Sequence, residues 1–243
     1  MDSSNSISGL QNRVCISVYG ETVSVLRANV NRALKLEPAY VELRLDYLRD
    51  FFGSLPGLSN IKRDRRLIFT FRARFEGGVS RVSDKLSKQI LLQLLSTVGP
   101  PTVDIELKTL EQFPELLDSV SDRSDTRLIV SSHNFAGTEN KSNLEELVLS
   151  SVRKYTPAIV KIVRQANAFD DNLTLLSLYR LSGSISPTKL IAFCSGSLGI
   201  YSRIVCVSYG SPFTFASLPG RTTAPGQFDF ESISSLLDSW GAK

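Results

Sequence analysis

The chain has 243 residues, with 28 Lys and Arg against 24 Asp and Glu, one His, three Cys and 42% hydrophobic residues. This composition is typical of a folded globular protein and excludes a disordered, fibrous or membrane-spanning chain. No stretch approaches the roughly 18 uninterrupted apolar residues that a spanning helix needs, and the N-terminus MDSSNSISGLQNR lacks the apolar core of a signal peptide. We therefore expect a cytoplasmic protein with no membrane partner.

The three cysteines, Cys15, Cys194 and Cys206, are odd in number, form no CxxC pair and lie in apolar surroundings. Neither a disulfide framework nor a zinc site is expected, and we interpret them as small core residues. The net charge of +4 is mild for this length, and the basic run at residues 62–66 is interrupted by Asp64. This run predicts a solvated loop rather than a nucleic-acid-binding surface.

Short apolar or β-branched runs alternate with segments of helical spacing, and no linker divides the chain. Ser83–Leu95 and Asn143–Lys154 are examples of the helical segments. We therefore predict one domain over residues 1–243, with a polar lead-in over about residues 1–12. The runs that predict strands are Val14–Val18, Tyr40–Leu45, Leu67–Arg72, Thr102–Leu107, Arg127–Ser132, Ala158–Val163 and Leu190–Phe193.

An eighth strand could lie at Ile204–Ser208 or at Pro212–Ala216, and the spacing favours the second segment. Successive runs begin about 22 to 35 residues apart, which leaves room for a strand, a helix and two loops. The first segment follows the run at Leu190 too closely for a helix to fit between them.

Eight such units need roughly 250 residues, so the pattern predicts an α/β fold of the (β/α)8 TIM-barrel type. A helix at Phe230–Trp240 would close it, with Gly241 just past its end. A doubly wound sheet is the alternative. The segment after the first run, Tyr19-Gly20-Glu21, lacks the glycine-rich turn of a dinucleotide or phosphate loop.

Polar side chains interrupt several of these runs, although parallel barrel strands are covered on both faces and should be almost wholly apolar. Spacing of two residues puts both members of a pair on one face of a strand, and most pairs lie near the carboxyl end, where barrel active sites are built. The residues concerned are Glu42 and Arg44, Thr70 and Arg72, Asp104 and Glu106, Ser131 and His133, and Lys161.

Lys161 stands alone among apolar residues in Ile159–Val163. A desolvated lysine that loses its proton can attack a ketone, whereas the alternative is a lysine paired with Asp104 or Glu106 inside the barrel. His133 is the only histidine, and imidazole suits proton transfer near neutral pH, although a lone histidine is often only hydrogen-bonded. Because neighbouring strands would present both side chains to one pocket, they suggest carbonyl chemistry through an iminium.

Arg44, Arg72 and Arg203 offer more positive charge than a neutral ligand needs, which favours an anionic small-molecule substrate. For each arginine, a carboxylate partner within the barrel is an equally good interpretation. Glu42 is such a candidate for Arg44.

Seven motifs follow one another in the order of a known family. They are Glu42-Leu43-Arg44-Leu45-Asp46, Thr70-Phe71-Arg72 with Glu76-Gly77-Gly78, Ser131-Ser132-His133-Asn134-Phe135, Val160-Lys161-Ile162, Gly199 with Ser202-Arg203, Gly210-Ser211-Pro212-Phe213-Thr214-Phe215-Ala216, and Ala224-Pro225-Gly226-Gln227. Together they resemble type I 3-dehydroquinate dehydratase from the first strand to the last helix. The resemblance implies a barrel hydro-lyase that converts 3-dehydroquinate to 3-dehydroshikimate, in the shikimate route to chorismate and aromatic amino acids. It also implies no metal or organic cofactor, a homodimer, and a helix at Ser202-Arg203.

The matching motifs imply that Lys161 is a Schiff-base lysine, His133 the general acid/base, and Glu76 the carboxylate that orients the histidine. Two positions depart from the family: Thr223 stands where a serine is usual, and Arg164 stands where a smaller or apolar residue is expected. Arg164 is expected to face outward and pair with an acidic residue on a helix. The substrate ligands that the resemblance implies are Ser17, Glu42, Arg44, Arg72, Arg203, Thr223 and Gln227.

Two other functions stay open. A class I aldolase also uses a lysine on the sixth strand, but the Arg203 and Gln227 motifs argue against it. A non-catalytic barrel could bind anions or nucleic acid through its basic surface, but that function gives no reason for Lys161 to occupy an apolar strand. Asp104 and Glu106 receive no role from the sequence.

Overall fold

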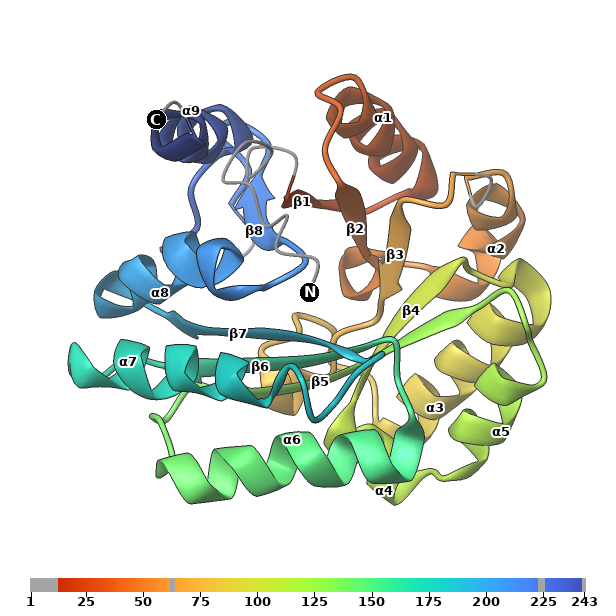
Figure 1. The fold of residues 1–243 in the computed structure, drawn as a ribbon. Coiled ribbons are helices and arrows are strands. Elements are labelled where there is room, and N and C mark those ends of the chain that lie inside the picture. Colours follow the sequence, from red (N-terminus) through yellow and green to blue (C-terminus); the bar gives the residue numbers. More distant parts are fainter. Residues whose placement is uncertain (1–12, 62–63, 223–225, 242–243) are drawn as a thin grey trace.

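The strands form one parallel sheet that curls into a nearly closed barrel (Figure 1). The computed structural model describes residues 13–61, 64–222 and 226–241, so the expected lead-in at residues 1–12 lies outside the described residues. Within these ranges the sheet has eight strands in the order β7-β6-β5-β4-β3-β2-β1-β8, with every neighbouring pair parallel. The strands are β1 Val14–Tyr19, β2 Tyr40–Arg44, β3 Leu67–Thr70, β4 Thr102–Glu106, β5 Arg127–Asn134, β6 Ile159–Gln165, β7 Lys189–Ser195 and β8 Thr214–Ser217.

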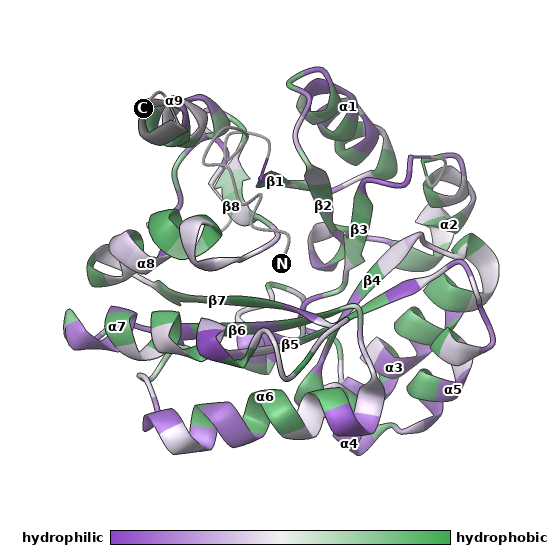
Figure 2. Cartoon of the chain, viewed as in Figure 1, coloured by the Kyte–Doolittle hydropathy of each residue, from purple (hydrophilic) through white to green (hydrophobic). Residues whose placement is uncertain are grey.

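Helices connect the strands and surround the sheet (Figure 1). Figure 2 shows strands such as β7 as mostly hydrophobic, whereas α6 alternates hydrophobic and hydrophilic residues. The two ends of the sheet order are β7 and β8, and α8 packs against both of them. The helices are α1 Val23–Leu34, α2 Phe51–Ser59, α3 Asp84–Gln93, α4 Leu107–Gln112, α5 Glu115–Ser121, α6 Lys141–Tyr155, α7 Asp170–Ser177, α8 Ile200–Val205 and α9 Phe230–Gly241.

The limits of α6 follow from its local sequence. The side chain of Asn140 caps the first turn by accepting the backbone N–H of Asn143 at 2.9 Å. Buried residues recur at intervals of three and four, at Leu144, Val148, Ser151 and Tyr155, so one face packs on the barrel. The predicted helix Asn143–Lys154 is therefore confirmed, with two more residues at its start and one at its end.

The β-prone segment Ile204–Ser208 is helical. Its first two residues end α8, and the other three lie in the 3₁₀ turn Cys206–Tyr209. The eighth strand lies at Thr214–Ser217, and the spacing argument for the later segment is confirmed with a start two residues further on. Gly241 ends α9 rather than following it, a shift of one residue at a helix end.

The apolar core fills the space between the sheet and its helices, in one cluster mainly around β1–β4 and another mainly around β5–β8. Cys15, Cys194 and Cys206 are free, buried members of the second cluster, so their interpretation as core residues is confirmed. Among the described helices, none is long and apolar enough to cross a membrane.

Candidate active site

Most of the polar residues that interrupt the strands converge on a cavity of about 300 Å³ at the carboxyl end of the barrel. Alternation along each strand puts residues two apart on the same inward face, which confirms the prediction from their spacing. The cavity is lined by Ser17, Glu42, Arg44, Arg72, Glu76, Gly77, His133, Phe135, Lys161, Val163, Phe193, Ser195, Arg203, Phe215 and Gln227.

Lys161 is buried on β6, with 4% of its surface exposed. Its Nζ lies 3.1 Å from Oδ2 of Asp104 and 3.6 Å from Oε1 of Glu42, and 4.2 Å from the centre of the Phe215 ring. Of the two carboxylates offered by the sequence as partners, the structure selects Asp104. The amine thus lies between an aromatic face and two acids, on the wall of the cavity.

Arg72, two residues past the end of β3, occupies the centre of a buried network with β4 and β5. Its guanidinium donates to Asp104 at 2.9 Å, to Glu106 at 2.7 Å and to Oγ of Ser131 at 2.7 Å. Ser131 in turn donates to Asp104 at 2.5 Å. Burial opposes ionisation of Asp104, but Arg72 and Lys161 outweigh it and hold the pKa of this carboxyl at about 2.

The roles left open for the two carboxylates of β4 can therefore be described by their contacts. Asp104 joins Arg72 to Lys161 and stays ionised. Glu106 accepts from Arg72 and also from the backbone N–H of Ala73 at 3.0 Å. These contacts fix the turn that follows β3, where the chain leads to Glu76.

His133 and Glu76 form a hydrogen-bonded pair at the carboxyl end of β5. Oε2 of Glu76 lies 2.8 Å from Nδ1 of the imidazole and also accepts the backbone N–H of His133 at 2.8 Å. An ionised Glu76 favours the tautomer with its proton on Nδ1, which leaves Nε2 as the base.

Burial affects the two members of this pair in opposite ways, because it disfavours the charged form of each. It lowers the pKa of His133 well below 6.5, with further contributions from Arg72 and Lys161. It raises the pKa of Glu76 to about 7, against the effect of Arg72. The imidazole is therefore neutral and able to accept a proton at neutral pH.

Glu42 is held by two hydroxyl groups from neighbouring strands. Ser17 donates to its Oε2 at 2.6 Å and Thr70 to its Oε1 at 3.0 Å. Burial raises the pKa of Glu42, but Lys161 and Arg44 outweigh burial, and the net shift is downward. An ionised Glu42 on the cavity wall can accept hydrogen bonds from ligand hydroxyls.

Arg44 pairs with a different acid from the one suggested by the sequence. Its Nε and Nη2 donate to the two carboxylate oxygens of Asp46 at 2.8 and 2.9 Å, rather than to Glu42. Asp46 follows β2 in a short 3₁₀ turn and also accepts the backbone N–H of Val79 at 3.0 Å. The last residue of β2 and a residue of the turn directly after it therefore make a bidentate pair that strand alternation does not predict.

Arg203 differs from the other arginines of the cavity, because no carboxylate in the described part of the chain pairs with it. It is 3% exposed, its Nε has no hydrogen-bond partner, and its guanidinium lies 4.6 Å from the ring centre of Phe193. Burial lowers its pKa to about 10, against small opposing effects of Cys206 and Cys194. This cation is suited to an anionic ligand.

Gln227 lines the same cavity, as expected, whereas Thr223 lies outside the described residues. Six lining residues were not predicted as site residues. Gly77, Phe135 and Phe215 belong to the motifs of the resemblance, whereas Val163, Phe193 and Ser195 belong to none of them. The same alternation that identified the polar pairs could have found them, because Val163 is two residues after Lys161, and Phe193 and Ser195 are two apart on β7.

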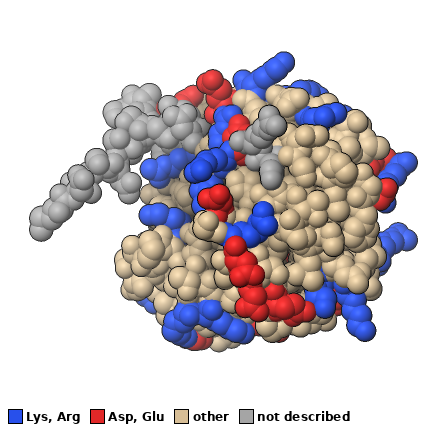
Figure 3. Space-filling model, turned by 90° about the vertical axis from the view of Figure 1, so that its right-hand side faces the viewer, with Lys and Arg blue, Asp and Glu red and all other residues tan. Residues whose placement is uncertain are grey.

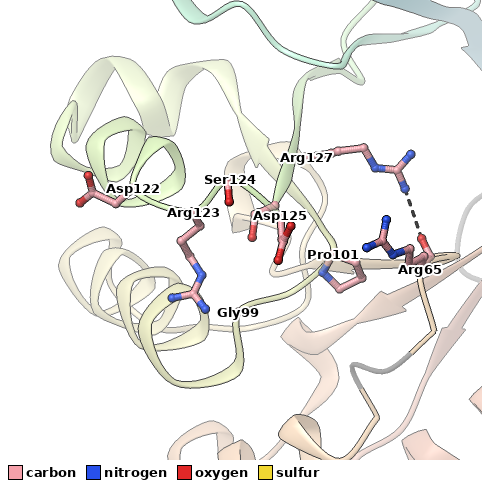
Figure 4. Close-up of a pocket in the computed structure, with 9 residues that line it drawn as sticks. Arg65, Gly99, Pro101, Asp122, Arg123, Ser124, Asp125 and Arg127 are labelled. Carbon is pink, nitrogen blue, oxygen red and sulfur yellow. Dashed lines mark hydrogen bonds between the residues drawn. The ribbon is translucent and has the colours of Figure 1, made fainter.

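A second cavity, of about 770 Å³, lies where the chain enters β4 and β5, at the opposite end of those strands. Figure 4 shows arginines and aspartates together around it, with Arg127 donating to the carbonyl oxygen of Arg65 at 3.2 Å. Figure 3, which shows the right-hand side of Figure 1, has basic and acidic side chains interleaved rather than one field of positive charge. Lys62 and Arg63 of the basic run lie outside the described residues.

The described ranges contain no three His, Cys, Asp or Glu side chains grouped as a metal site requires. The fold and the cavity define a (β/α)8-barrel protein with the polar cavity of a barrel enzyme at the carboxyl ends of its strands. The chain belongs to the type I 3-dehydroquinase family, whose model matches residues 14–243.

Curated relatives and solved structures agree with this assignment. A 3-dehydroquinate dehydratase of Dehalococcoides mccartyi is 35% identical over 202 residues, which cover 83% of this chain and 86% of that protein. One from Methanococcus maripaludis is 33% identical over 93% of this chain and 98% of its own length. The crystal structure of 3-dehydroquinate dehydratase from Geobacillus kaustophilus has a TM-score of 0.83 at 24% identity, covers 94% of this chain and 90% of that chain, and shows the same fold.

Proposed function

We propose that this protein is a 3-dehydroquinate dehydratase, the hydro-lyase that forms 3-dehydroshikimate in the shikimate pathway, acting through a lysine Schiff base. Membership of the type I family and the names of the relatives support the reaction. The observation that carries the mechanism is that Lys161 and His133, from neighbouring strands, line one cavity.

Lys161 is the nucleophile in this proposal. Its amine, once freed of the proton that it carries in the ion pair with Asp104, adds to the ring ketone. The resulting carbinolamine loses water to give a positively charged iminium, which acidifies the neighbouring carbon and acts as the electron sink. The ionised carboxylates of Asp104 and Glu42, 3.1 and 3.6 Å from Nζ, stabilise that positive charge.

His133 moves the protons. The neutral imidazole takes the proton from Lys161 as the amine adds to the ketone, and returns it to the carbinolamine hydroxyl group, which leaves as water. Neutral again, the imidazole removes the proton from the carbon beside the iminium, which gives an enamine. The enamine electrons expel the β-hydroxyl group, and the protonated His133 supplies the proton that makes this group leave as water. Hydrolysis of the conjugated imine releases the product and restores Lys161. Glu76 holds the imidazole in place throughout.

The substrate carboxylate and hydroxyl groups bind around this pair. Arg203, a buried cation without a carboxylate partner in the described ranges, binds the substrate carboxylate. Gln227 lines the same cavity. Arg44 and Arg72 add positive potential, while Glu42 and Ser17 face the ring hydroxyls. Thr223 is proposed as a further ligand from its motif alone.

The proposal is tested by incubating the protein with 3-dehydroquinate, following the enone absorbance, and treating a parallel sample with borohydride before peptide mass spectrometry. We expect turnover and a reduced adduct on Lys161, both lost in Lys161→Met. Lys189→Met, at the exposed start of β7, is the matched control and keeps both. Turnover without an adduct would disprove the Schiff base. The absence of both turnover and adduct would favour an aldolase or an anion-binding barrel.

A homodimer and a cytoplasmic location, together with a single domain over residues 1–243, remain predictions from the sequence. Light scattering of the purified protein tests the dimer, and cell fractionation tests the location. Binding of nucleic acid with a steep salt dependence would contradict the expected lack of a nucleic-acid partner.

A further inference from the structure

Arg164, which departs from the family pattern, is buried on the outer side of the barrel. It stands three residues after Lys161 on β6, so the two side chains point to opposite faces of the sheet. Only 1% of its surface is exposed. The outward direction expected from the sequence is confirmed, but its acidic partner, Glu139, precedes the cap of α6 instead of lying in a helix.

Each of the three nitrogens of the Arg164 guanidinium donates at least one hydrogen bond. Nε donates to Oε2 of Glu139 at 2.5 Å, Nη1 to the carbonyl oxygens of Ser132 and Val163 at 2.8 and 2.9 Å, and Nη2 to Oγ of Ser132 at 3.2 Å. A planar guanidinium makes this set of contacts because its donors are fixed in one plane. Lysine could replace the charge but not the geometry.

Arg164 and Glu139 together contact β5 at the residues directly before and directly after His133. Ser132, directly before the histidine, accepts from Arg164 through its backbone and its hydroxyl group. Asn134, directly after it, donates its side-chain amide to Oε1 of Glu139 at 3.1 Å. Arg164 and Glu139 thus bind the two residues that flank His133 from the outer side of the barrel, while Glu76 binds His133 on the cavity side.

We infer that Arg164, together with Glu139, is a positioning residue that fixes the end of β5 and thereby the direction of the His133 imidazole. The inference rests on the proposed function, in which His133 moves the protons. Arg164 does not line the cavity, so it acts through the strand and not on the substrate. Proton transfer depends steeply on the distance and angle of the base, which makes a small shift of β5 costly for the rate.

The charge of Arg164 also reaches the imidazole. Burial lowers the pKa of His133 first, and the nearby cations, Arg164 among them, lower it further. Removal of this charge should therefore raise the pKa of His133. The charged groups around the imidazole are Arg44 from β2, Arg72 and Glu76 from the segment after β3, Asp104 and Glu106 from β4, Glu139 from the segment before α6, and Lys161 and Arg164 from β6.

The test uses the fact that His133 is the only histidine, so an untagged protein labelled with ¹³C-histidine gives one imidazole signal. Its titration by NMR and the kinetics with 3-dehydroquinate are measured for the wild type, Arg164→Met, Arg164→Lys and Glu139→Gln. Tyr179→Phe is the control, because it also removes a buried polar contact on the outer layer, with Ala192 of β7, away from His133.

We expect Arg164→Met to lower kcat by about tenfold or more with little change in KM, and to raise the His133 pKa by about 0.5 or more. Arg164→Lys keeps the charge, so it should have the wild-type His133 pKa but recover only part of kcat. Glu139→Gln should also lower kcat, although Arg164 itself is unchanged in that variant. Tyr179→Phe should leave both measurements as in the wild type.

Kinetics and titration of Arg164→Met that match Tyr179→Phe would overturn the inference. If Arg164→Met does not fold, an unchanged kcat in both Glu139→Gln and Arg164→Lys would overturn it equally. A wild-type protein that shows no turnover would instead refute the proposed function, and the titration alone would still report whether Arg164 acts on the imidazole.

Discussion

Arg203 is a buried cation whose ionic partner, on our proposal, is the substrate. Replacement by methionine removes the charge but keeps an apolar side chain over the Phe193 ring, which lies 4.6 Å from the guanidinium. Arg203→Met should therefore have two opposite effects. It should weaken substrate binding and make the free protein more stable.

The size of both effects follows from the surroundings of Arg203. Its pKa falls from 12.5 to about 10, so the folded state disfavours the charged form by roughly 3 kcal/mol. Lost packing offsets part of this, and we expect a gain of about 1–3 kcal/mol, at roughly 2–4 °C in Tm for each kcal/mol. The lost charge-assisted hydrogen bond, worth about 1.5–3 kcal/mol, should raise KM roughly 10- to 150-fold.

Arg72→Met is the matched control, because Arg72 is equally buried but paired with Asp104 and Glu106. Removing one partner of a buried pair costs about 3–5 kcal/mol, so this variant should lose thermal stability. The assays are thermal unfolding without ligand and steady-state kinetics with 3-dehydroquinate. A lower Tm for Arg203→Met, or an unchanged KM, would refute the reasoning.

Three further predictions concern the cavity and its supports. Glu76→Gln should lower kcat roughly 10- to 150-fold, because the hydrogen bond between His133 and a charged partner, worth about 1.5–3 kcal/mol, is lost. Burial raises the pKa of Glu76 to about 7, so the wild-type kcat/KM should decline as the pH falls through about 7, and a variant that keeps this limb would contradict the assignment. Burial opposes ionisation of Asp104, but Arg72 outweighs it and lowers the pKa from 3.8 to about 2. The stability from Asp104 is therefore present above pH 3.8 and lost as the pH falls through about 2, and urea unfolding of Asp104→Asn should show a loss of about 3–5 kcal/mol at neutral pH and a weaker acid dependence. Gly77→Ala should cost about 1–2 kcal/mol in thermal unfolding, since φ is +87° there and an added Cβ would lie 2.7 Å from a neighbouring ring; an unchanged Tm would speak against this strain.

The sequence by itself determined the barrel and the inward direction of its polar residues. Parallel strands covered on both faces must be apolar, so their runs stand out, and their spacing leaves room for one helix each. The two-residue period of a strand then places Glu42 with Arg44 and Ser131 with His133 on the cavity side. These conclusions need only local geometry, which is why they agree with the structure.

Element boundaries and one element type depended on packing. The β-branched residues of Ile204–Ser208 favour a strand by propensity, yet the segment is helical and α8 packs against both β7 and β8. Propensity is a weak preference that tertiary contacts override. Length and spacing were better guides there than residue type.

Only the tertiary structure decided which charges meet. Lys161 pairs with Asp104 and Arg164 with Glu139, across 57 and 25 residues of chain. Arg44 pairs with Asp46 rather than Glu42, and Arg203 has no carboxylate partner among the described residues. Electrostatic energies depend on distances of a few ångströms, and the register of neighbouring strands sets these distances, which residue types alone do not specify.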